Sequence, residues 1–289
     1  MLTINMGVPI KAAPTLEVVH MATSVLSFSV RIARHGAELQ EASAVRAAAY
    51  GHHLPSMAPA LAQALAVPDA VDIGPGTVVL VCRDKCSAAV VGTARIQRNH
   101  PQPLQIERSV ALPSALADQP RAEITRLAIL AGADAQVRPM LIKACYLYAV
   151  AAQIRWLVIG ARSPALIRVY QRLGFDDLLG AGQQVPLAHA GGLPHSVLAF
   201  DVVAAERTWH AAQHGLYGFM VETWHPDLQL LAEPTAAPVP RPARPGTRPR
   251  LLSGFHERMP SRRPSAQPPS LPAQQPALAR PAGALAQPA

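Results

Sequence analysis

The sequence predicts a mixed α/β domain built on one mostly antiparallel sheet, followed by a tail that lacks core-forming residues. Segments with helical and with strand periodicity alternate along residues 29–233, and one apolar run follows directly on a helix. Residues 234–289 hold 14 of the 29 prolines of the 289-residue chain. We therefore expect an N-terminal extension over 1–28, a folded domain over 29–233 and a disordered Pro/Ala/Arg-rich tail over 234–289.

The first half of the domain is predicted to supply one long helix and the outer strands. Ser29–Arg34 is typical of a short strand, and Glu38–Tyr50 places Ala and Leu at helical spacing. Ala58–Ala66 could form a short helix within a Pro-rich loop. The β-branched apolar run Thr77–Cys82 predicts a buried strand, and Ala88–Gln97 is its expected hairpin partner.

The second half is predicted to supply the centre of the sheet. Arg121–Leu130 alternates as a central strand, and Val137–Gln153 is a helix with Pro139 in its first turn, where proline is tolerated. Arg155–Gly160 follows that helix and is therefore expected to run parallel to the preceding strand. The remaining expected elements are a helix, an antiparallel pair and a last helix, over Pro164–Leu173, Gln183–Leu187, His195–Val202 and Glu206–Val221.

The net charge of +8 is concentrated outside the predicted domain. Residues 234–289 hold eight Arg, no Lys and one acidic residue, so residues 1–233 are nearly neutral. A basic nucleic-acid-binding face on the domain is therefore not expected. Three cysteines are too few for a disulfide framework, and no apolar stretch reaches the ~18 residues of a transmembrane helix. With no secretory signal, we expect a soluble cytoplasmic protein.

Five motifs carry a resemblance to a known family. The segment LIRVYQRLGFDDL (Leu166–Leu178) resembles the closing helix and Gly-Phe turn of the GNAT N-acyltransferase superfamily. Four further motifs resemble, in order, those of the long-chain N-acyl amino acid synthases of the FeeM type and of the related N-acylhomoserine lactone synthases: VRAAAY (45–50), DAVD (69–72), VGTARI (91–96) and AEITRLAI (122–129). The resemblance covers about residues 30–180. It implies a GNAT-like mixed, mostly antiparallel sheet with a parallel, splayed centre flanked by helices.

This resemblance implies transfer of a long-chain fatty acyl group to the α-amine of an amino acid, tyrosine being the acceptor associated with the family. The loop AGADAQVRPML (131–141) has one glycine, whereas acetyl-CoA-using relatives place several glycines there to bind the CoA pyrophosphate. The implied donor and partner is therefore acyl carrier protein, whose phosphopantetheine thioester is a co-substrate; no other cofactor, metal or nucleic acid is implied. The product would be a fatty-acyl amphiphile that we expect to associate with membranes.

Three other functions remain open. Autoinducer synthases carry a Trp shortly after the first-helix aromatic residue, where this chain has GHHLP (51–55), so that branch is ranked second. An acetyl-CoA acetyltransferase is disfavoured by the missing glycines. A non-catalytic binding module on the same scaffold is the alternative outside enzymes, and the presence of Glu123 favours the enzyme.

Glu123, Arg126 and Tyr170 are the candidate catalytic residues. Glu123 could take the proton of the substrate amine, or it could form a structural ion pair with an arginine. Arg126 points to the opposite face from Glu123 in a regular strand, and a β-bulge, which the fold resembled here commonly has, would change that. Tyr170 could protonate the leaving thiolate, or its ring could simply pack.

Substrate contacts are predicted from three groups of residues. Arg46 or Arg95 could bind the carboxylate of the acceptor, or both could form a buried network with Asp69 and Asp72. Backbone N–H groups where the fourth strand bulges could stabilise the oxyanion. Side chains at the splay could line an acyl tunnel or belong to the core. The residues concerned are Leu127, Ala128 and Ile129 for the oxyanion, and Met140 and Trp156 for the acyl chain.

Overall fold

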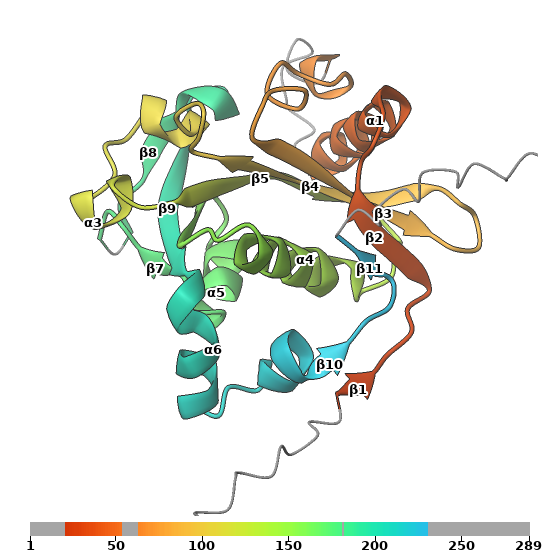
Figure 1. Ribbon diagram of the computed structural model, residues 1–289. Helices are drawn as coiled ribbons and strands as arrows, with labels where there is room; N and C mark the ends of the chain where they lie inside the picture. Colours follow the sequence, from red (N-terminus) through yellow and green to blue (C-terminus); the bar gives the residue numbers. More distant parts are fainter. Residues whose placement is uncertain (1–20, 54–62, 181, 231–289) are drawn as a thin grey trace, which may run out of the picture. The chain divides into compact units, whose positions relative to one another are not determined.

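The computed structural model describes residues 21–53, 63–180 and 182–230, and Figure 1 shows them arranged around one central sheet. The strands of this sheet are β2 (Phe28–Ile32), β3 (Thr77–Asp84), β4 (Val90–Arg98), β5 (Arg121–Ile129), β6 (Trp156–Ala161), β7 (Asp176–Asp177), β8 (Val185–Leu187), β9 (Leu193–Asp201) and β11 (Leu228–Gln229). The strand order is β11-β2-β3-β4-β5-β6-β9-β7, with β8 paired to β9. A separate two-stranded sheet pairs β1 (Ala22–Thr23) with β10 (Thr223–Trp224).

The helices lie on both faces of the sheet. They are α1 (Gly36–His53), α3 (Ser114–Ala117), α4 (Val137–Ala151), α5 (Pro164–Arg172) and α6 (Val202–Ala211), with the 3₁₀ turns η1 (Gln105–Arg108) and η2 (Ala188–Ala190) and the π-helical turn η3 (Gly218–Glu222). None of the helices in the described part of the chain is long and apolar enough to cross a membrane. The predicted tail, residues 1–20 of the predicted extension and most of the predicted helix Ala58–Ala66 lie outside the described residues.

The predicted fold class is confirmed. At the centre, β5 and β6 run parallel, while β4 beside β5 and β9 beside β6 run antiparallel to them. The parallel pair arises because α4 carries the chain back across one face of the sheet before β6 begins, as the apolar run after the predicted helix indicates. The predicted strands are present, as are the helices predicted over Glu38–Tyr50, Val137–Gln153 and Pro164–Leu173, with ends displaced by a few residues.

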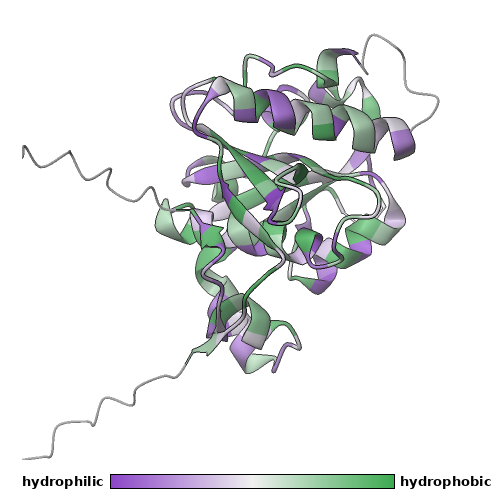
Figure 2. Ribbon diagram, turned by 90° about the vertical axis from the view of Figure 1, so that its right-hand side faces the viewer, coloured by the Kyte–Doolittle hydropathy of each residue, from purple (hydrophilic) through white to green (hydrophobic). Residues whose placement is uncertain are grey.

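Each face of the sheet has its own apolar core. On one face, α1 packs against β3, β4 and β5 through Ala42, Val45 and Ala49. On the other face, α4 covers the sheet, with α5 and α6 on the same side (Figure 1). α4 approaches β4 so closely that a Cβ on Gly92 would lie 2.8 Å from the Val137 side chain. Figure 2 shows the strands between these layers coloured largely as hydrophobic.

The last predicted helix, Glu206–Val221, is wrong at both ends. α6 begins earlier because the Asp201 carboxylate accepts hydrogen bonds from the backbone N–H groups of Val203 and Ala204, which is the geometry of an N-cap. The helix ends at Ala211, and the chain turns at Gln213, whose φ is +47°. Helical periodicity over 206–221 therefore comes from two separate elements, α6 and η3.

A buried lysine attaches the segment after α6 to the domain. Lys143 on α4 is 2 % exposed, and its Nζ donates to the carbonyl oxygens of Phe219 (2.5 Å) and Thr223 (2.7 Å). The Nδ1 atom of His225 lies 3.1 Å from the same Nζ. These contacts satisfy carbonyl groups at the end of η3 that would otherwise be buried without donors.

The stability of the fold should depend on the charge of Lys143. Burial lowers the pKa of this lysine to about 8, whereas an unfolded lysine titrates near ~10.4. Between these pH values the unfolded chain binds more protons than the folded chain, so the free energy of unfolding should rise with pH. Urea unfolding of wild type and Lys143→Met at several pH values in this window measures the effect. The wild type should gain stability relative to the variant as pH rises, and two parallel curves would contradict this.

Candidate active site

A β-bulge in β5 lies beside the point where β5 and β6 separate. Two residues of β5, Arg126 and Leu127, stand opposite Ala94 of β4, and Arg126 has a φ of +56°. The parallel pairing of β5 with β6 ends at Ile124 and Ile159, so the last five residues of β5 have no partner in β6. Both the expected bulge and the expected splay of the two central strands are therefore present.

The bulged end of β5 directs a backbone N–H toward the splay. The N–H of Leu130 donates to the carbonyl of Val91 at 2.9 Å, which makes these two residues a hydrogen-bonded pair of the antiparallel ladder. Such pairs alternate along the ladder, so the N–H of Ala128 is directed to β4 and that of Ile129 away from it. The N–H of Ile129 therefore lies on the open side of β5 and that of Ala128 does not, while Leu127 belongs to the bulge, where this alternation is interrupted.

Glu123 lies three residues before Arg126, the first residue of the bulge, and is completely buried. Its Oε2 accepts a hydrogen bond of 3.0 Å from the N–H of Ile106 in η1. Its Oε1 lies 3.1 Å from Nε2 of His189 in η2, at ion-pair distance, but makes no hydrogen bond within the described residues. The partner of Glu123 is thus a histidine, and Arg126 approaches Asp69 instead, at 3.7 Å.

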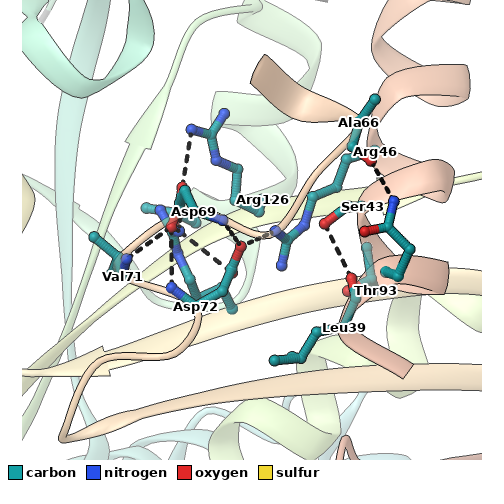
Figure 3. A network of polar contacts seen from close by, with 12 residues as sticks. Leu39, Ser43, Arg46, Ala66, Asp69, Val71, Asp72, Thr93 and Arg126 are labelled. Carbon is teal, nitrogen blue, oxygen red and sulfur yellow. Dashed lines mark hydrogen bonds and ion pairs between the residues drawn. The ribbon is translucent and has the colours of Figure 1, made fainter. Parts of the chain in front are cut away.

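Figure 3 shows Arg46 and Arg126 joined to Asp72 and Asp69, respectively, in one network of polar contacts. Arg46 Nη1 donates to Asp72 Oδ2 at 2.7 Å, and Arg95 Nη1 lies 2.8 Å from both carboxylate oxygens of Asp69. The Asp69 carboxylate also accepts from the N–H of Asp72. Although burial alone would raise it, the pKa of Asp69 is lowered, chiefly by the Arg95 guanidinium. The motif around 69–72 thus forms a loop that supplies two carboxylates to arginines from α1 and β4.

The three arginines differ in how many of their N–H groups have hydrogen-bond partners in the protein. Arg95 is fully engaged: its Nε donates to the Thr125 hydroxyl and its Nη2 to Gln105 Oε1, in addition to the aspartate contacts. In contrast, Nε and Nη2 of Arg46 are buried and have no hydrogen-bond partner within the described residues. Arg126 is 19 % exposed, and burial together with the Arg95 charge lowers its pKa. Three guanidinium groups therefore face two carboxylates; the buried donors without a partner belong to Arg46, and Arg126 makes only the 3.7 Å contact with Asp69.

The 3₁₀ turn η1 connects this network to Glu123. Gln105 accepts from Arg95, and its neighbour Ile106 donates to Glu123. Glu107 in the same turn pairs with Arg121 at the start of β5. The predicted base and the arginine cluster are thus two parts of one site on the face of the sheet that α1 covers.

Tyr170, Met140 and Trp156 lie outside this cluster. Tyr170 and Met140 belong to the core between the sheet and α4, where burial, followed by the neighbouring Cys145, raises the pKa of Tyr170. Trp156 packs with residues of the opposite face, because side chains alternate along β6. Met140 and Trp156 therefore do not line one tunnel together, whereas Leu127 and Ile129 face the α4 side near the splay.

A carboxylate lies just before the start of α4. Asp134 Oδ1 accepts a 2.8 Å hydrogen bond from the N–H of Gln136, and Asp134 Oδ2 accepts from the Ser27 hydroxyl. These hydrogen bonds lower the pKa of Asp134. Asp134 also lines a cavity of about 270 Å³ together with Asp84. The start of α4 therefore presents negative charge to this cavity. In the acetyltransferases that the sequence resembles, the CoA pyrophosphate binds at the corresponding helix start.

Sequence reasoning missed His189, Gln105 and Asp134. His189 and Gln105 belong to turns without regular periodicity, and their contacts join positions 66 and 10 residues apart in the chain. Asp134 carried a local signal, since an Asp side chain often accepts from the backbone N–H two residues on in a turn, here that of Gln136.

Comparisons with known proteins find structural similarity at low sequence identity. No family model and no curated protein matches the chain. FeeM, an N-acyl amino acid synthase from uncultured soil microbes, is 18% identical over 67% of this chain and 98% of that chain, with a TM-score of 0.49. The ribosomal-protein-S5-alanine acetyltransferase from Vibrio fischeri is 12% identical over 62% and 96%, with a TM-score of 0.44. An N-acetyltransferase from Staphylococcus aureus Mu50 is 13% identical over 61% and 98%, with a TM-score of 0.40. At such low identity, the activity has to follow from this chain's own residues.

Proposed function

We propose that this chain is an N-acyltransferase that joins a long-chain acyl group, carried as a thioester on acyl carrier protein, to the α-amine of an amino acid. The observation that carries the proposal is the arrangement of β5 between Glu123 and Ile129. Within seven residues, this strand holds a buried carboxylate, a bulge and an N–H directed into the gap beside β6. Aminolysis of a thioester needs a base, an oxyanion donor and space for the acyl carbonyl, in that proximity.

The chemistry assigns a role to each part of the strand. The amine arrives protonated and loses a proton to Glu123. The free amine then attacks the thioester carbonyl, whose oxygen becomes negative and accepts a hydrogen bond from the Ile129 N–H. Collapse of the tetrahedral intermediate forms the amide bond, and the departing phosphopantetheine thiolate takes up the second proton of the nitrogen and leaves as the thiol. Tyr170 is buried in the core beside Cys145. The proposal therefore gives it no role in protonating the thiolate.

The arginine cluster supports an acceptor with a carboxylate. A bound carboxylate would balance the third guanidinium group and give the donors of Arg46 or Arg126 a charged acceptor. An amino acid presents its carboxylate one carbon from the reacting amine. Because η1 joins the cluster to Glu123, binding the carboxylate there would place the amine near the base. Tyrosine remains the acceptor that the resemblance implies.

The negative charge at the start of α4 supports acyl carrier protein over acyl-CoA as the donor. A helix start favours a phosphate because its free N–H groups and dipole are positive. Here the Asp134 carboxylate already accepts from that helix start and would repel a diphosphate. A phosphopantetheine arm on a carrier protein presents the same thioester without the adenosine diphosphate.

We expect kcat/KM to be far higher with acyl carrier protein thioesters than with the matching acyl-CoA. Asp134→Asn keeps the side-chain shape and removes the charge, so it should improve kcat/KM for acyl-CoA by about two- to fivefold, the size of a helix-dipole effect. The same variant should change kcat/KM for the carrier-protein donor little. Steady-state kinetics with both donors measures this. Equal kcat/KM for the two donors in the wild type would contradict the proposed donor.

The proposed function is tested by mass spectrometry of organic extracts from a bacterial host that overexpresses the full chain. N-acyl amino acids should accumulate with the wild type and not with Glu123→Gln expressed at the same level. Accumulation of acylhomoserine lactones would support the second-ranked function instead. Extracts indistinguishable from those of the empty host, together with no acyl transfer by the purified protein, would contradict both enzymes and favour a binding module.

A further inference from the structure

The proposed reaction has to release a proton from a base that solvent does not reach. Forming an amide from an ammonium group removes two protons from the nitrogen. The departing thiolate takes up one of them, so one proton must reach the solvent in each turnover. Glu123 is the proposed first acceptor, and it is 0 % exposed. A second group must therefore take the proton from Glu123.

His189 is the ionisable group next to Glu123. Its Nε2 lies 3.1 Å from Glu123 Oε1, and its side chain is 10 % exposed. Glu123 Oε1 makes no hydrogen bond within the described residues, whereas Oε2 is held by the Ile106 N–H. The carboxylate is thus held through Oε2 by the backbone, while Oε1 faces the imidazole.

We propose that His189 is the second member of a proton-transfer pair and accepts from Glu123 the proton that the substrate amine gives up. This inference rests on the proposed function. The amine proton passes to Oε1 of Glu123 and then to Nε2 of His189, and the imidazolium loses this same proton from Nε2 to solvent, since Nδ1 is buried. No bond other than those to the transferred proton changes, and Glu123 returns to its ionised form.

The neighbouring histidine shows why His189 in particular is suited to this role. His195 Nδ1 lies 2.7 Å from the Leu193 carbonyl, a contact that fixes this nitrogen as a donor. His189 Nδ1 has no hydrogen-bond partner within the described residues, so its protonation is not fixed by the backbone. Other ionisable groups on the packed elements are Glu107 and Arg108 of η1, and Arg162 beside His195. The direct contact with Glu123 belongs to His189.

The first test replaces His189 with glutamine, which keeps an amide that can hold Glu123 but cannot accept a proton. We expect kcat with acyl carrier protein thioester and amino acid to fall about 10²-fold, with both KM values nearly unchanged and an unchanged melting temperature. The matched control is His195→Gln, which should retain wild-type kcat. A His189→Gln enzyme within a few-fold of wild type would overturn the proposal.

Chemical rescue separates proton acceptance from packing. His189→Gly leaves room for an added ring, and imidazole should restore much of the lost kcat. Pyrazole has nearly the same shape and hydrogen-bonding atoms but is a far weaker base, so it should not. Rescue of equal size by both compounds, or by neither, would show that His189 does not accept the proton.

The pairing can also be tested without catalysis. Ring ¹⁵N spectra of the full chain should show the His189 Nε2 resonance shifted in Glu123→Gln, with the His195 resonances unchanged. An unchanged His189 resonance would overturn the pair even if the enzyme is an acyltransferase. A shifted resonance in a protein that transfers no acyl group would leave the contact intact and reject the proposed function, and with it the catalytic role of His189.

Discussion

Replacing Glu123 with glutamine should lower kcat by about 10²–10⁴-fold at neutral pH, the usual contribution of a general base. Glutamine retains the shape of the side chain and an oxygen that can accept from the Ile106 N–H, so the local structure should persist. The loss should shrink as pH rises, because more of the amine then arrives already deprotonated. Steady-state kinetics across pH, with the folded fraction measured by circular dichroism, tests this expectation.

A structural role for Glu123 makes a different prediction for the same variant. If the carboxylate served only to balance a buried partner, removing its charge would cost on the order of 3–5 kcal/mol of stability. Activity would then follow the folded fraction at every pH. Glu41→Gln is the matched control, since it breaks an ion pair with Arg83 that is exposed and remote from Glu123. A fully folded Glu123→Gln enzyme with nearly wild-type kcat would contradict both roles.

Replacing Arg126 with glutamine should raise the KM for the amino acid by about 10- to 100-fold, the equivalent of one lost charge-assisted hydrogen bond. Arg126 is the better target within the cluster because its contact with the protein is the long one, 3.7 Å to Asp69. Arg46 is 2 % exposed and pairs with Asp72, so its replacement would also destabilise the fold. Initial rates at varied amino-acid concentration measure the effect.

A second acceptor substrate, the amine without the carboxylate group, separates the contribution of the carboxylate from that of the rest of the amino acid. The amine that lacks the carboxylate should be a poor substrate for the wild type, and Arg126→Gln should use it equally well. Arg83→Gln removes an exposed arginine outside the cluster and should leave both acceptors unaffected. If Arg126→Gln changed kcat/KM for the two acceptors by the same factor, the carboxylate would not bind at Arg126.

Most of the fold could be predicted because periodicity and composition are local. The run Thr77–Cys82 and the alternation over Arg121–Leu130 lie within β3 and β5 as observed, displaced by at most two residues. The helix predicted over Glu206–Val221 could not be placed correctly in this way. Its true start depends on an Asp201 cap, and its end depends on a turn at Gln213.

The part of the candidate site that could be predicted is the part whose side chains belong to sequence motifs. Arg46, Arg95, Asp69 and Asp72 meet in one network, which is one of the two alternatives predicted for these residues. The contact of His189 with Glu123 depends on the path of η2 over the sheet. No local sequence pattern predicts that path. The choice of Ile129 among the oxyanion donors required the register of β4 against β5.

The backbone at Arg126 has a consequence for how this protein can evolve. A left-handed conformation costs a residue with a Cβ about 1–2 kcal/mol, and glycine would adopt it freely. The charge of the Arg126 side chain adds to this cost, because burial and the neighbouring Arg95 charge disfavour its cationic form. Arginine at this position therefore lowers stability, and the proposed binding of the acceptor carboxylate is the function that would retain it. Descendants that no longer need the reaction would gain stability by losing this side chain first.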